Sequence, residues 1–239
     1  MNLELRLAAL SKLMDAKSDE ADKRIVQEFA TAEQVLQQSV EFDELSAALK
    51  TLGVLAPKFH GAMIPLLKDF ARSVESKTLT LGNVSVSRSL RRFQSASVLI
   101  REAIEVAERI RYVKTEEVLD FLLELSSSGD EDVRNSALRA MEKLAEFNID
   151  VFFGEHGQGA SPQARIVAHL SGLDSERLVS NRTIILQTLA AVLSPSMQGT
   201  SSTYNRVTFR RGAIPKSYGV AEMRSAAIAL LKKMYSLSE

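Results

Sequence analysis

The chain has 239 residues, of which 45% are hydrophobic, and its 30 Lys and Arg balance 30 Asp and Glu. This hydrophobic content is sufficient for a buried core and excludes a disordered chain. The zero net charge excludes a general attraction to nucleic acid or membranes. The absence of cysteine excludes disulfides and thiolate chemistry.

No apolar stretch reaches the roughly 20 residues that a membrane-spanning helix needs, and the N-terminus has no uncharged run typical of a signal peptide. We therefore expect a cytoplasmic protein without membrane contact.

Apolar residues spaced three and four apart predict four helices in residues 1–75. A glycine and a proline, Gly53 and Pro57, follow the third stripe and predict its end. Pro65 lies within the fourth stripe, where it should kink the helix or mark its real beginning. The four apolar stripes run over Leu3–Met14, Ile25–Val40, Phe42–Leu52 and Phe59–Val74.

The period changes from helical to alternating at residues 78–87. Thr78 to Leu81 and Val84 to Ser87 alternate apolar and hydroxyl residues on either side of Gly82-Asn83, a pair suited to a primed two-residue turn. This pattern predicts a short β-hairpin within an insert at 76–92. An isolated two-stranded ribbon is marginal in water, so its apolar face should pack on the helices or on a partner.

Helical patterning resumes near Phe93 and continues, with one further insert, to the C-terminus. Thr115 followed by two glutamates reads as an N-cap, and Thr115 to Phe147 forms the clearest helix–turn–helix unit. The glycine-containing stretch 148–160 reads as a loop. The remaining predicted helices lie around Gln163–Leu170, Asp174–Leu193 and Val220–Tyr235, with an irregular insert at 195–219.

These signals predict about ten helices in a single α-helical repeat domain spanning 1–239. Its expected parts are N-terminal helices (1–75), a basic hairpin insert (76–92), helical repeats (93–194), a basic insert (195–219) and a final helix (220–239).

One helical phrase recurs, an arginine followed by small or apolar residues three and seven positions later. The arginines are Arg101, Arg134, Arg182 and Arg224. Successive arginines are separated by roughly 30–50 residues, which is about the length of one helix pair in a stacked repeat. The copy at Arg101 breaks the rule, because its last position is Glu108. An arginine in the first turn of a helix opposes the helix dipole, so a nearby acid is expected to pair with it.

The segment Asp130-Glu131-Asp132-Val133-Arg134-Asn135-Ser136-Ala137-Leu138 resembles the second helix of HEAT/armadillo-like repeats. Ile100-Arg101 and Met223-Arg224 repeat its apolar–Arg pair, whereas Asn181-Arg182 lacks the apolar residue. The resemblance is good from Phe93 to Phe147, partial to the C-terminus and generic before Ser76. It implies an all-α, HEAT/armadillo-like right-handed α-solenoid in which Asp130 or Asp132 pairs with Arg134. No specific family is identified, and such a fold does not fix a function.

Both inserts are basic and contain no acid. Each carries four cations, in residues 76–97 and 195–221, which together make up a candidate site for phosphates, nucleic acid or an acidic protein surface. The alternative is that these cations are solvated or cap helix C-termini. The eight residues are Lys77, Arg88, Arg91, Arg92, Arg206, Arg210, Arg211 and Lys216.

Three functions are compatible with this sequence, and the first is favoured. It is a non-catalytic scaffold or adaptor that binds a protein partner through exposed apolar side chains within residues 1–75. The second is nucleic-acid or other polyanion binding through the two inserts. The third is an enzyme, a HEAT-like DNA glycosylase, but those enzymes rely on tryptophan, which this chain lacks. Bilin lyase subunits are a further HEAT-like alternative with still less support.

No catalytic residue, cofactor or metal ligand set is predicted. His60, His156 and His169 show no ligand spacing, and Gly154, Gly157 and Gly159 lack the lysine of a phosphate-binding loop.

The C-terminal residues Met234, Tyr235 and Leu237 are apolar where a repeat array usually ends in a polar capping helix. We therefore expect either a segment of a longer protein or an end that is buried in an oligomer.

Overall fold

The computed structural model describes residues 3–76, 88–145, 162–193 and 220–237. These residues form helices and turns and contain no strand, which confirms the all-α class. The hairpin predicted at 78–87 and the insert predicted at 195–219 lie outside the described residues. The chain divides into two compact units, Met1–Ser136 and Ala137–Glu239.

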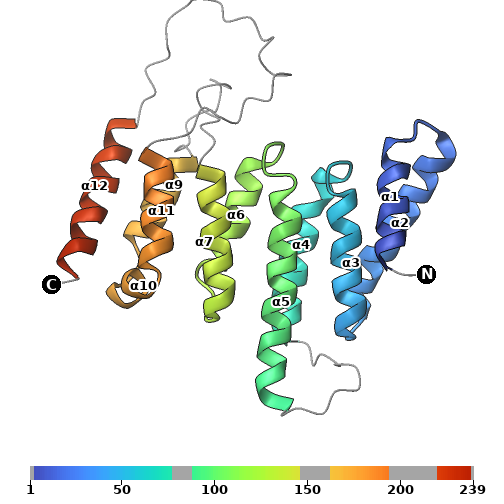
Figure 1. Cartoon of the computed structure of the whole chain (residues 1–239), viewed down its shortest axis with the longest axis horizontal. Helices are drawn as coiled ribbons and strands as arrows, with labels where there is room; N and C mark the ends of the chain where they lie inside the picture. The colour runs from blue at the N-terminus through green and yellow to red at the C-terminus, as the bar shows by residue number, and fades with distance from the viewer. Residues whose placement is uncertain (1–2, 77–87, 146–161, 194–219, 238–239) are drawn as a thin grey trace, which may run out of the picture. The chain divides into compact units, whose positions relative to one another are not determined.

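Unit 1 consists of two rows of helices. In one row α3 packs against both α1 and α5, and in the other α4 packs against α2 and α6 (Figure 1). Contacts of α2 with α3 and of α4 with α5 join the rows. Helices two apart in sequence are therefore neighbours in space. The helices are α1 (Leu3–Asp15), α2 (Asp19–Gln38), α3 (Phe42–Leu55), α4 (His60–Ser76), α5 (Arg88–Glu108), α6 (Thr115–Leu125) and the start of α7 (Glu131–Ala145).

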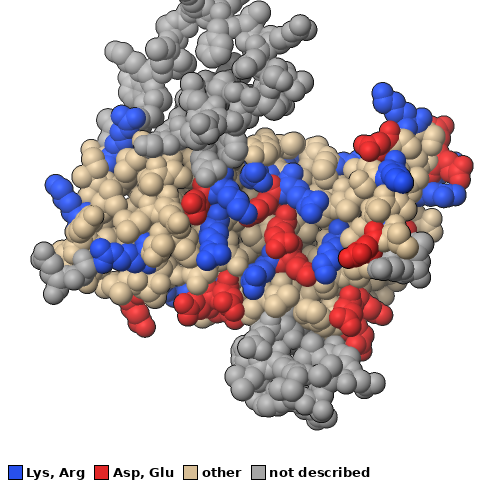
Figure 2. Space-filling model, in the orientation of Figure 1, with Lys and Arg blue, Asp and Glu red and all other residues tan. Residues whose placement is uncertain are grey.

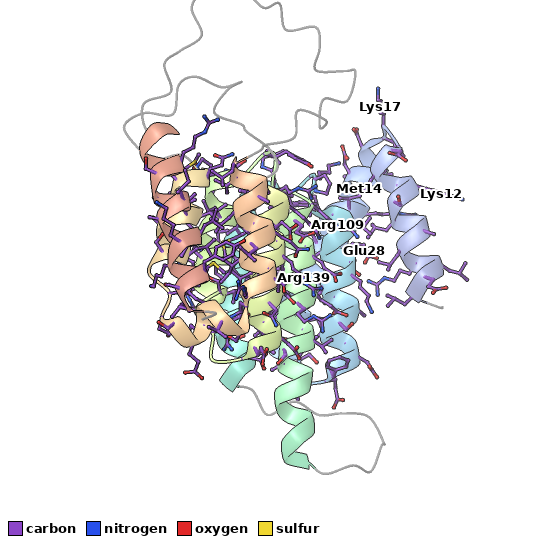
Figure 3. All side chains as sticks on the ribbon, turned by 60° about the vertical axis from the view of Figure 1, so that its left-hand side comes forward. Lys12, Met14, Lys17, Glu28, Arg109 and Arg139 are labelled. Atoms are coloured by element: carbon purple, nitrogen blue, oxygen red, sulfur yellow. The ribbon has the colours of Figure 1, made fainter. Side chains whose placement is uncertain are left out.

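The core of unit 1 is made by the apolar stripes that the sequence pattern predicts. Leu45, Leu49 and Leu52 on α3 and Leu99 on α5 are fully buried. At the N-terminal end, Leu10, Ile25 and Leu55 form a smaller cluster, against which Phe29 and Phe59 stack with ring centroids 4.2 Å apart. Met14 lies on the side of α1 that faces α3, whereas Lys12 points away from the other helices (Figure 3).

Local capping explains where several helices begin. The side chain of Ser18 accepts a hydrogen bond from the backbone N–H of Ala21, and three acids occupy the first turn of α2. Asp130 caps α7 in the same way, since its Oδ1 accepts from the N–H of Val133 at 3.1 Å. Thr115, in contrast, was wrongly predicted as an N-cap. It is the first residue of α6, and its hydroxyl donates to the carbonyl of Arg111 at 2.7 Å, in the preceding turn.

Two breaker residues lie inside helices rather than at their ends. Helix α3 continues through Gly53 to Leu55, because Gly53 is buried where α5 approaches closely. A Cβ at Gly53 would lie 3.4 Å from Nε of Arg109 and 3.7 Å from a methyl group of Val106. Pro65 is the sixth residue of α4, so it does not mark the beginning of that helix.

The described part of unit 2 contains the remainder of α7 and four further helices. Helix α12 packs mainly against α9 and also against α11. The predicted helix at Asp174–Leu193 is broken at Asn181, whose buried side-chain amide donates to the carbonyl of Arg177 and so competes with the helical pattern. The helices are α9 (Pro162–Ser171), α10 (Ser175–Ser180), α11 (Arg182–Leu193) and α12 (Val220–Ser236).

None of the helices in the described ranges combines the length and the apolar character that crossing a bilayer requires.

Candidate functional site

The basic residues predicted from the inserts are only partly described by the structure. Lys77, Arg206, Arg210, Arg211 and Lys216 lie outside the described residues.

The other three, Arg88, Arg91 and Arg92, lie in the first five residues of α5. Helix α5 therefore begins five residues before the predicted start near Phe93, and these arginines belong to a helix rather than to a loop.

Their position has an electrostatic consequence. The first turn of α5 contains no acid, and the N-terminus of a helix carries a partial positive charge of its own. This end of a helix favours anions and disfavours further positive charge.

Two of the repeated arginines, Arg134 and Arg182, contact groups other than acids. Arg134 donates to the carbonyl oxygens of Ser128 and Gly129 at 2.9 and 2.8 Å. Neither Asp130 nor Asp132 forms an ion pair with it among the described contacts, so the predicted pairing is wrong. Asp130 instead accepts a 2.5 Å hydrogen bond from Ser97 on α5. Asp130 thus links the turn before α7 to α5, and Arg134 stabilises that turn by donating to its carbonyl groups.

Arg182, the third arginine of the phrase, lies over the ring of Tyr235 with its Cζ 5.8 Å from the ring centroid. This is a cation–π contact between the first residue of α11 and the last turn of α12.

The two histidines that the structure describes, His60 and His169, show no metal-binding arrangement. Within the described ranges, no three His, Asp or Glu side chains lie close enough together to hold a metal ion. Burial, and secondarily the charge of Arg177, lowers the pKa of His169 below its ordinary value of 6.5. His169 is therefore neutral at pH 7. His156 and the glycines around it lie outside the described residues.

Helix α12 carries two apolar stripes, and only one is buried. Ala227, Leu230 and Met234 are buried against the rest of unit 2. One residue further along, and therefore rotated by about 100°, Ile228, Leu231 and Tyr235 form a second stripe.

This second stripe is largely solvent-exposed. Ile228 is 49% exposed, Tyr235 is 67% exposed and Leu231 is half-buried. We call these three residues the α12 face. Arg224 and Lys232, both exposed, lie one turn before Ile228 and one residue after Leu231, so the α12 face is apolar with a basic border.

Helix α1 carries a smaller exposed apolar stripe. Leu5 is 64% exposed, and Ala8 and Ala9, three and four residues later, are also exposed. We call these residues the α1 face. On α2, Val26 is 55% exposed. The prediction that helices within residues 1–75 expose apolar side chains is met by Leu5 and Val26.

Single exposed apolar residues are ordinary on protein surfaces, whereas stripes at helical spacing are a better sign of a binding surface. The α12 face was not predicted as such. Its signal is present in the sequence, because apolar residues occupy positions 227, 228, 230, 231, 234 and 235 and so cover more of the helix than one core can bury.

The described surface of unit 1 carries charges of both signs on the face shown in Figure 2. On the face in Figure 2, Lys and Arg alternate with Asp and Glu across its helices. The ion pairs of unit 1 include Arg6–Glu28, Lys50–Glu102 and Arg72–Glu124.

Comparison with protein-family models, with curated protein sequences and with solved structures found no match to this chain.

Proposed function

We propose that the chain is a non-catalytic α-solenoid scaffold that binds other proteins in the cytoplasm. The observation that carries this proposal is the α12 face, a stripe of large apolar side chains on a helix whose opposite stripe is already buried. Covering such a stripe removes apolar area from water, at roughly 25 cal/mol per Å². The α1 face offers a second, smaller surface of the same kind.

The packing of unit 1 favours the solenoid assignment. In a stack of helix pairs each helix contacts the corresponding helix of the next pair, and α1, α3 and α5 follow this order, as do α2, α4 and α6. The hydrogen bond from Ser97 to Asp130 links successive pairs in the same direction. A HEAT-like array accounts for both features.

The proposal is tested by comparing the proteins captured from cells by the tagged wild-type chain and by surface variants. Ile228→Asp and Leu5→Asp should each remove a set of captured proteins. Val113→Asp is the matched control, since Val113 is 62% exposed in the turn after α5 and belongs to neither face. Identical capture by all four chains would contradict the assignment.

A second candidate function, polyanion binding, is favoured by one specific observation, the three arginines at the start of α5. Phosphates would bind there through the guanidinium groups and the positive helix terminus. The experiment is a fluorescence-anisotropy titration with a single-stranded oligonucleotide at two salt concentrations.

For this test the triple change of Arg88, Arg91 and Arg92 to Ser should abolish salt-dependent binding. Arg101→Ser, an exposed change on the same helix, should leave it intact. Equal binding by both variants would exclude this site.

A further inference from the structure

The zero net charge of the chain conceals an asymmetry between its two units. Residues 1–136 contain 18 Lys and Arg against 22 Asp and Glu, a net charge of −4. Residues 137–239 contain 12 against 8, a net charge of +4. Two copies of the chain would therefore attract when unit 1 of one approaches unit 2 of the other.

The regions that carry the two exposed apolar faces have the same asymmetry, although α1 itself is balanced, with two acids and two cations. Helix α12 carries Arg224, Lys232 and Lys233 against a single acid, Glu222. Residues 3–38, which form α1 and α2, carry seven acids against five cations. Ion pairs within unit 1 use two of these cations and three of these acids, in Arg6–Glu28, Arg24–Glu20 and Lys58–Asp22.

The side chains also differ in size in a complementary way. The α12 face presents the large residues Ile228, Leu231 and Tyr235, whereas the α1 face presents Ala8 and Ala9 beside Leu5. Small residues allow a second helix to approach closely and to insert its large side chains between them.

From these observations we propose that the α12 face of one copy docks on the α1 face of a second copy, giving head-to-tail self-association. This inference rests on the exposed faces that support the proposed function, and it names a second copy of the chain as their occupant. A symmetric pairing of two α12 faces is disfavoured, because it would place Arg224 and Lys232 of both copies against each other.

Head-to-tail contact has a distinct consequence for assembly. Each copy that uses its α12 face still has a free α1 face, so the contact is heterologous and continues until a ring closes or a filament forms. The apparent mass should therefore increase with protein concentration. A contact within one copy would leave the mass constant.

The experiment uses two variants of the full chain, each blocking one face, in light-scattering measurements after size exclusion. Leu5→Asp blocks the α1 face and Ile228→Asp blocks the α12 face. Each variant alone should be a monomer, because placing an unpaired carboxylate in the contact is costly. An equimolar mixture should form a dimer that does not grow, since only one intact pair of faces is then available.

Controls separate loss of contact from loss of structure. Both replaced residues are exposed, so circular dichroism should match that of the wild type, and Val113→Asp should assemble as the wild type does. A wild-type chain that is monomeric at every concentration overturns the inference. So does a Leu5→Asp variant that still dimerises alone, which would indicate symmetric pairing through α12. If the wild type is monomeric and Ile228→Asp still loses captured proteins, the scaffold function stands without self-association.

Discussion

The turn before α7 offers the most direct quantitative test of how the helices of unit 1 are held together. Asp130 makes two contacts there, as N-cap of α7 through Val133 and as acceptor from the buried Ser97 of α5. Arg134 contacts carbonyls of the same turn without pairing with the aspartate. Replacing Asp130 with Ala therefore removes a helix cap and a link between helices in one step.

The expected loss follows from these two contacts. Removal of an N-cap costs about 1 kcal/mol, and a hydrogen bond to a charged group contributes about 1.5–3 kcal/mol. Asp130 is partly exposed, so we take the lower part of this range and expect Asp130→Ala to cost about 2–3 kcal/mol. Asp130→Asn should cost less, since asparagine is also a good cap. Asp132→Ala, the matched control in the first turn of α7, should cost about 0.5 kcal/mol through the helix dipole.

Urea unfolding followed by circular dichroism measures the change. With a slope of about 2 kcal/mol per molar urea, the midpoint for Asp130→Ala should fall by about 1–1.5 M. Amide hydrogen exchange of peptides from α5 and α7 assigns the loss to this turn rather than to unit 2.

A double-mutant cycle decides which partner of Asp130 matters. The coupling energy between Ser97 and Asp130 should be about 1–2 kcal/mol, and that between Asp130 and Arg134 should be below about 0.5 kcal/mol. The reverse order would refute the reasoning and would restore the aspartate–arginine pair expected from the HEAT resemblance.

Three further changes test the packing and the charge of single residues. Gly53→Ala should stabilise the chain by about 0.5–1 kcal/mol in thermal or urea unfolding, because alanine favours the helix and its methyl group makes an ordinary contact with Arg109. A loss of stability would show that the two helices cannot accept the methyl group. Pro65→Ala should also be stabilising, by about 1–3 kcal/mol, since it restores a backbone hydrogen bond inside α4; an unchanged midpoint would contradict this. Burial and Arg177 lower the folded-state pKa of His169, so its contribution to stability is intact above pH 6.5 and is lost as the pH falls from 6.5 towards the folded-state pKa. His169→Gln should reduce this loss in unfolding curves between pH 7 and about 5, and identical pH dependence in both proteins would show that another group titrates.

The helices themselves could be predicted from local pattern, because an apolar stripe at helical spacing needs only one chain segment to be recognised. The final helix was predicted at Val220–Tyr235 and runs over Val220–Ser236. The wrongly predicted helix boundaries result either from packing against a second segment or from a competing side-chain hydrogen bond. Gly53 stays helical because α5 lies against it, and Asn181 breaks a helix because its amide binds a backbone carbonyl.

Of the candidate binding surfaces, one could be predicted from the sequence and one could not. The sequence predicts that some helices within residues 1–75 expose apolar side chains. Leu5 and Val26 are such exposed side chains. The α12 face could not be identified from the sequence alone, since a helix that is apolar on two sides can be buried on either side or on both.

The sequence by itself determined the helical class, most helix positions, the arginine phrase and the apolar excess of α12, because each depends on residues close together in the chain. Only the tertiary structure decided which apolar stripe of α12 is buried and that Leu5 is left outside the core. It also decided the partner of Asp130, which binds Ser97, 33 residues away, rather than Arg134 in the adjacent turn. These outcomes depend on which helices become neighbours, since contacts between distant segments determine which side chains are covered and which groups bind each other.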